Sequence, residues 1–199
     1  MITNTSYKSV FIILVLLLPI LWISAQQVTE LVVLDEAMQN KELIMECLND
    51  NMEIIILPDG VNQLDVLTEK LKEYTDLEAL HLLVCGREGM IMLNGTPLQN
   101  DNISEHSQQL SSWRTSFKET GDMMIYTCNL ASSDQGKLVV RKLSAYTGLD
   151  VAASTNNTGN LGDKGDWNLE FMKGKIETGT CFNAEKISNF PGKFERTTE

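Results

Sequence analysis

The stretch "LEALHLLVCG", residues 77–86, decides the fold of this chain. It is a nearly continuous apolar run that reaches Cys85 and then turns at Gly86. Such runs are typical of parallel strands, because helices cover both faces of a parallel sheet. The segment just before it, 61–76, carries leucines at helical spacing. We therefore predict an α/β fold built around this strand.

The alternation of apolar runs with helix-like segments continues along the chain. Further strands are predicted at 30–36, 52–58, 122–129 and within 147–154, and further helices at 37–50, at about 101–117 and from Ser133 or Asp134 to Gly148. The glycine-rich segment after Cys85 predicts a small β-hairpin, and a short strand is expected from Trp167 to Phe171. The fold class is thus a single α/β domain with a mostly parallel five-stranded sheet and helices on both faces.

The first 25 residues are predicted to be a secretory signal peptide. Lys8 is the one basic residue before an apolar run from Val10 to Ile23, and small residues precede Gln26. The run is shorter than the roughly 20 residues that span a bilayer, so we expect cleavage near Gln26, no membrane span afterwards and an extracellular location. An uncleaved signal anchor is the alternative. The predicted organisation is a signal peptide at 1–25, a domain at 26–175 and a weakly anchored C-terminal tail at 176–199.

Composition excludes some partners and leaves others open. The formal net charge is −11 and no Lys or Arg cluster is present, so nucleic acid is not an expected ligand. The four cysteines form no CxxC pair and there are two histidines, so we expect neither a metal site nor a cofactor. Asn94, Asn102 and Asn156 lie in sequons and are candidate glycosylation sites in a secreted protein.

Candidate functional residues follow the predicted strands. Ligands of an α/β sheet bind outside the carboxyl ends of its strands, and Asp35, Asp59, Cys85 and Cys128 all lie at such ends. Cys85 and Cys128 end consecutive strands, which are often spatial neighbours. Three interpretations of this pair stay open: a disulfide bond, two buried core side chains, and a reactive thiol at Cys128.

Several motifs resemble a known family. They are "GREGMIMLNG" (86–95), "IYTCNLASSDQG" (125–136), "DVAASTNNTG" (150–159) and "GDWNLE" (165–170). Their order resembles the domain of unknown function 4347 family, which stands at the start of large bacterial cadherin-like and calcium-repeat surface proteins. That family is similar to the caspase and gingipain group of cysteine peptidases. The resemblance covers about residues 30–172 and implies a caspase-like arrangement.

The resemblance also assigns roles to individual residues. Cys128 falls on the nucleophile, Asn129 follows it as in the family, and Gly86 matches the glycine after the catalytic histidine. The histidine position itself holds Cys85, and Thr127 replaces the usual glycine before the nucleophile. Because these two cysteines occupy positions that face one site, the resemblance favours a disulfide between them.

The substitution at the histidine position determines the functional expectation. A cysteine nucleophile needs a base to form its thiolate, and a second cysteine cannot replace imidazole. His81 lies four residues before Cys85, about 13 Å away along a strand at ~3.3 Å per residue, and His106 lies on a predicted helix. We therefore expect a catalytically inactive relative that binds a protein or cell-surface partner and is associated with adhesion. The alternative is a secreted cysteine peptidase that uses Cys128.

Overall fold

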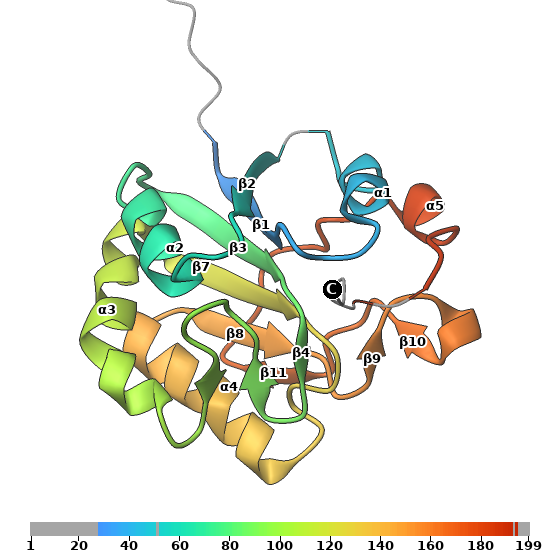
Figure 1. Ribbon diagram of the computed structural model, residues 1–199. Coiled ribbons are helices and arrows are strands. Elements are labelled where there is room, and N and C mark those ends of the chain that lie inside the picture. Colours follow the sequence, from blue (N-terminus) through green and yellow to red (C-terminus); the bar gives the residue numbers. More distant parts are fainter. Residues whose placement is uncertain (1–27, 51, 193, 195–199) are drawn as a thin grey trace, which may run out of the picture.

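A central sheet of six strands organises the protein (Figure 1). This computed structural model describes residues 28–50, 52–192 and 194, so the predicted signal peptide lies outside the described residues. The sheet strands are β1 (Glu30–Asp35), β2 (Glu53–Leu57), β3 (Leu77–Leu83), β7 (Phe117–Tyr126), β8 (Asp150–Ala153) and β11 (Phe171–Lys173). Their order is β11-β8-β7-β3-β1-β2, and every neighbouring pair is parallel except β11 with β8. The predicted α/β fold with a mostly parallel sheet is confirmed, with an antiparallel sixth strand added at one edge.

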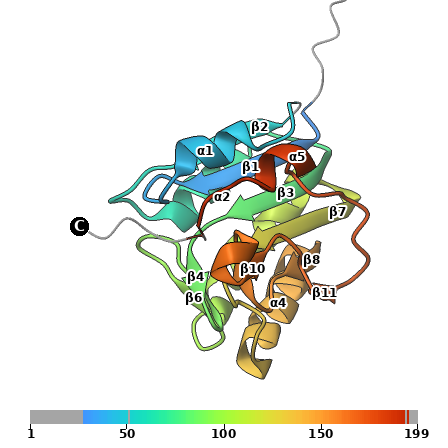
Figure 2. The same ribbon diagram turned by 90° about the vertical axis from the view of Figure 1, so that its right-hand side faces the viewer.

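Helices lie on both faces of this sheet (Figures 1 and 2). One face carries α2 (Gln63–Leu71), α3 (Ser107–Ser112) and α4 (Asp134–Thr147), and the other carries α1 (Lys41–Glu46) and α5 (Ala184–Ile187). The shorter elements are β4 (Gly86–Arg87), β5 (Met90–Ile91), β6 (Leu98–Gln99), η1 (Ile103–His106), η2 (Trp113–Ser116), β9 (Asn157–Thr158), η3 (Leu161–Asp163) and β10 (Gly165–Asp166). The predicted hairpin is the β4–β5 pair, which β6 extends to three strands.

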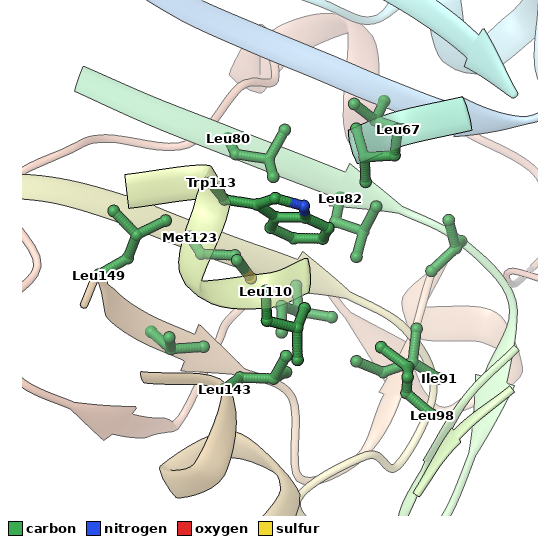
Figure 3. Close-up of a cluster of buried hydrophobic side chains, with 14 of the residues drawn as sticks. Leu67, Leu80, Leu82, Ile91, Leu98, Leu110, Trp113, Met123, Leu143 and Leu149 are labelled. Carbon is green, nitrogen blue, oxygen red and sulfur yellow. The ribbon is translucent and has the colours of Figure 1, made fainter. Parts of the chain in front are cut away.

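Two hydrophobic clusters fill the two faces. Alternate side chains of a strand point to opposite faces, so Leu80 and Leu82 of β3 join the cluster under α2, α3 and α4. Leu83 points the other way, into the cluster under α1 and α5. Trp113 lies in the middle of the first cluster, between β3 and α3 (Figure 3), and its Nε1 donates a hydrogen bond to Thr68 Oγ1 at 2.9 Å. The continuous apolar strands are thus explained by burial on both sides.

Three predicted helices are shorter than expected, and of the predicted segment 61–76 only Gln63–Leu71 is helical, as α2. The segment 37–50 contains only α1, because Ala37 N donates to Asp35 Oδ1 at 3.1 Å and Asn40 has left-handed backbone with φ 56°. These contacts hold a turn until Lys41. The segment 101–117 is divided into η1, α3 and η2, and Phe117 already begins β7. The helix from Ser133 to Gly148 forms as predicted, with Ser133 at its N-cap and Gly148 in the left-handed conformation at its C-cap.

The C-terminal segment is firmly packed, which corrects the expectation of a weakly anchored tail. Phe182, Phe190 and Phe194 are buried, and their rings contact Trp167 at centroid distances of 4.8, 5.5 and 5.4 Å. Phe182 also forms an antiparallel bridge with Leu48, just after α1. Trp167 itself precedes β11 rather than lying on a strand. Residues 181–190 and 194 therefore complete the cluster on the α1 and α5 face.

No helix within the described residues is long and apolar enough to cross a membrane.

Candidate functional site at the carboxyl ends of β3 and β7

The two cysteines lie at adjacent strand ends, as predicted. The strands β3 and β7 pair in parallel with Leu83 opposite Tyr126. Cys85 and Cys128 each follow these strand ends by two residues. The Cys128 side chain lies on the face of α1 and α5, in the same cluster as Leu83 and Tyr126.

Of the three interpretations of Cys85 and Cys128, the structure does not show the disulfide bond. The structure describes all four cysteines, places each in the interior and forms no disulfide bond among them. Cys128 Sγ lies instead 3.7 Å from Thr158 O and 3.6 Å from Phe194 O, within reach for its thiol to donate a hydrogen bond. The thiol of Cys128 is therefore oriented toward the segments that follow β8, and its side chain belongs to the hydrophobic cluster there.

A cavity of about 350 Å³ opens beside Cys128. Its lining residues are Gly86, Arg87, Glu88, Cys128, Asn129, Ser132, Asn157 and Phe194. Three of the residues predicted from strand ends, Gly86, Cys128 and Asn129, thus come together here. Two lining residues, Arg87 and Glu88, were not predicted from the sequence. They directly follow Gly86 along the chain and bring one positive and one negative charge to the cavity.

Asn129 has a defined conformation at this cavity. Its backbone is left-handed, with φ 58°, and its N donates to Asn156 O at 2.7 Å. Its Nδ2 donates to Asn157 Oδ1 at 2.7 Å. Asparagine is one of the few residues that tolerate this backbone, so the residue after Cys128 orients the loop that carries the thiol.

The glycine at 86 is required by its neighbour Thr127. A β-carbon added at Gly86 would overlap the Thr127 hydroxyl and lie 2.6 Å from Met90 O. Thr127 is completely buried. The Thr127 side chain therefore fits here because Gly86 has no β-carbon.

Asp35 and Asp59 do not line this cavity. Asp35 is buried and its Oδ1 accepts a hydrogen bond from Gln63 Nε2 at 3.0 Å, while Gln63 Oε1 accepts from Asn94 N at 2.8 Å. Asn94 Nδ2 in turn donates to Asp59 Oδ1 at 2.5 Å. These two strand-end aspartates thus join β1 and β2 to α2 and the loop after β5. The sequence did not predict that Gln63 is buried and connects them, because a glutamine at the start of a helix is usually exposed to solvent.

Both histidines lie away from the Cys128 cavity. His81 is buried within β3, with Nε2 3.0 Å from Glu30 Oε2 and its ring stacked on Tyr126 at 6.2 Å. His106 ends η1, on the opposite face of the sheet. Neither belongs to the lining of the cavity.

The other two cysteines are core residues with suppressed reactivity. Burial raises the pKa of the Cys181 thiol well above its ordinary value. Burial, with a smaller contribution from the Glu46 carboxylate, also raises the pKa of the Cys47 thiol. A raised pKa lowers the thiolate fraction at neutral pH, and the thiolate is the reactive form.

The comparison with known families gives one match. Residues 31–194 match the family described as Domain of unknown function (DUF4347). The chain belongs to this family. Among curated proteins no significant match was found. The match extends through the C-terminal segment, so the DUF4347 domain of this chain includes the residues that cover Cys128.

The three sequon asparagines of this DUF4347 domain are partly buried. The Asn94 amide donates a hydrogen bond to Asp59, and the Asn102 amide donates one to Pro97 O. The Asn156 amide donates to Asp166 and Glu170. Glycosylation at these sites stays a prediction.

Proposed function

We propose that this DUF4347 protein is a secreted, catalytically inactive domain that binds a protein or cell-surface partner. The observation that supports it best is the environment of Cys128. At the position where the family resemblance places a catalytic histidine stands Cys85, and the Cys128 thiol faces backbone carbonyl oxygens.

This environment favours the unreactive form of the thiol. A carbonyl oxygen can accept a hydrogen bond from S–H but cannot donate one to a thiolate, so the contacts with Thr158 O and Phe194 O offer a negative sulfur no donor. Burial adds to the effect, because Cys128 is only 8% exposed and a buried thiolate loses hydration. The same contacts place Phe194 of the C-terminal segment over the sulfur.

The alternative function is a secreted cysteine peptidase of the caspase and gingipain type. The cavity beside Cys128 favours it, since Arg87 and Asn129 could bind a substrate's polar groups there. A peptide-library hydrolysis assay on the wild-type chain and on Cys128→Ala separates the two functions. The inactive domain gives the same background cleavage in both, whereas loss of a measurable rate in the alanine variant would establish the peptidase.

The edge strand β2 offers a surface for the binding role. Within the described sheet β2 pairs with β1 alone, and Ile54 and Ile56 are 38% and 41% exposed on it. An exposed edge strand with apolar side chains is suited to adding a strand from another chain. We infer that a protein partner pairs with this edge.

A photo-crosslinking residue tests this surface. In place of Ile56 it should give a defined adduct on the surface of cells that produce the protein. The control is the same residue in place of Leu138, a comparably exposed position on α4. Equal adducts from both positions, or none from position 56, would contradict binding at β2.

Secretion is tested separately by N-terminal sequencing of the protein from culture medium. The expected N-terminus is near Gln26, and retention of residues 1–25 in a membrane fraction would indicate the signal anchor instead.

A further inference from the structure

A cluster of three carboxylates lies at the opposite end of the sheet from Cys128. Asp122 of β7 stands opposite Asp150 of β8 in the parallel register, and Glu177 comes from the segment between β11 and α5. This segment passes beside the middle of β7 and the beginning of β8. One oxygen from each of the three carboxylates lies within 4.8 Å of the others.

The backbone after β11 folds around the two aspartates. Lys175 N donates to Asp150 Oδ2 at 2.8 Å, and the backbone N atoms of Glu177 and Thr178 donate to Asp122 Oδ2 at 2.9 and 2.8 Å. Gly174 permits this approach, since it has φ +97° and a β-carbon there would overlap the Asp150 carboxylate. The turn is thus shaped to bring Glu177 to the aspartates.

One carboxylate oxygen of Asp122 remains unsatisfied in the interior. Asp122 is fully buried, and its Oδ1 has no hydrogen-bond partner among the described residues. A buried carboxylate oxygen without a donor is costly to desolvate, and two further carboxylates nearby add repulsion. The positive charge beside them is Lys175 Nζ, 2.8 Å from Glu177 Oε1, but this side chain is 83% exposed.

We propose that Asp122, Asp150 and Glu177 bind a divalent cation, and that the ion is calcium. Carboxylate oxygens are the ligands that hard cations prefer, and calcium–oxygen distances of about 2.3–2.6 Å allow ligand atoms up to about 5 Å apart. Magnesium requires a tighter octahedron at about 2.0–2.1 Å. Sequence analysis predicted no metal site, because the three ligands are separated by 28 and 27 residues and meet only in the fold.

Bound calcium would join β7 and β8 to the segment that follows β11. The cation would neutralise the cluster, and Lys175 would move away from Glu177 into solvent. In the apo protein Lys175 pairs with Glu177 and would compete with an incoming cation for this carboxylate. Neutralising the lysine should therefore strengthen calcium binding, whereas neutralising the glutamate should weaken it.

Isothermal titration of the EDTA-treated full chain with CaCl2 tests the site. The wild-type chain should bind one equivalent, with a dissociation constant on the order of 0.1–1 mM, as in extracellular calcium modules. Glu177→Gln, which leaves all backbone contacts in place, should weaken binding at least about tenfold. Lys175→Gln should tighten it. Glu185→Gln is the matched control, an exposed carboxylate in the first turn of α5 whose loss should leave binding unchanged.

Calcium should also raise the melting temperature of the wild-type chain and of Glu185→Gln, but not of Glu177→Gln, because a ligand that binds only the folded state stabilises it. The proposal is overturned if 10 mM CaCl2 gives neither saturable heat nor a melting shift, or if Glu177→Gln binds calcium as the wild-type chain does. An equal response to MgCl2 would overturn the choice of calcium.

Discussion

Gly86 and Thr127 form a complementary pair at the residue scale. The Thr127 side chain fills the space that a β-carbon at position 86 would need. We predict that Gly86→Ala lowers the free energy of unfolding by about 1–3 kcal/mol, the usual cost of overpacking. Urea denaturation measures it. Gly179→Ala is the control, because a β-carbon there meets no atom within 4 Å, and an equal loss in both variants would contradict the pairing.

The sequence could predict a site residue only where the end of a strand fixes the position of that residue. Gly86, Cys128 and Asn129 follow two adjacent parallel strands, and the pairing of these strands brings them to one cavity. Asp35 and Asp59 satisfy the same rule but lie near α2, and Gln63 binds the first of them. Such long-range partners are set by packing between elements, which no local pattern encodes.

At the scale of elements, the beginning of α4 depends on Gly136. A β-carbon there would overlap the carbonyl of Leu130, six residues earlier, and Leu130 O also accepts a hydrogen bond from Gly89 N at 3.1 Å. Gly136→Ala should therefore cost about 1–3 kcal/mol of unfolding free energy, although alanine is the better helix former by ~1 kcal/mol. A stabilised variant in thermal unfolding would show that the close contact is unimportant.

The C-terminal segment is the second element-scale prediction. Phe182 contacts Tyr126 and Trp167, with ring centroids 5.1 and 4.8 Å away. Phe182→Ala should destabilise the protein by about 3–5 kcal/mol. Met172→Ala, at a side chain that is 55% exposed, should change stability by less than about 0.5 kcal/mol. A loss under 1 kcal/mol at Phe182 would indicate that the segment is only loosely attached.

Helix and strand positions were largely predictable, while their ends and the C-terminal packing were not. The continuous apolar strands are a strong signal because both faces are buried. The segment after 176 alternates polar and aromatic residues without helical or strand period. Its aromatic side chains are ordered by Trp167 and by the end of α1, so its burial is a tertiary effect.

At the scale of the whole molecule, the two candidate sites lie at opposite ends of one sheet. The cavity beside Cys128 lies at the carboxyl ends of β3 and β7, and the carboxylate cluster lies toward the amino-terminal ends of β7 and β8. The C-terminal segment reaches both, through Glu177 at one end and Phe194 at the other. Calcium at one end and the contact with Cys128 at the other would therefore both attach this one segment to the rest of the domain.

The central claim is that Cys128 is unreactive because its thiol is buried and faces carbonyl oxygens. The most direct test is the rate of iodoacetamide modification of Cys128 in the native full chain from pH 6 to 9, followed by mass spectrometry. Cys181, whose thiol pKa is raised by burial, is the internal reference. We predict that Cys128 is modified as slowly as Cys181 at pH 7 and that both react readily after unfolding. Selective modification of Cys128 at pH 6–7, well below the ordinary thiol pKa of about 8.5, would contradict the claim and establish an activated nucleophile.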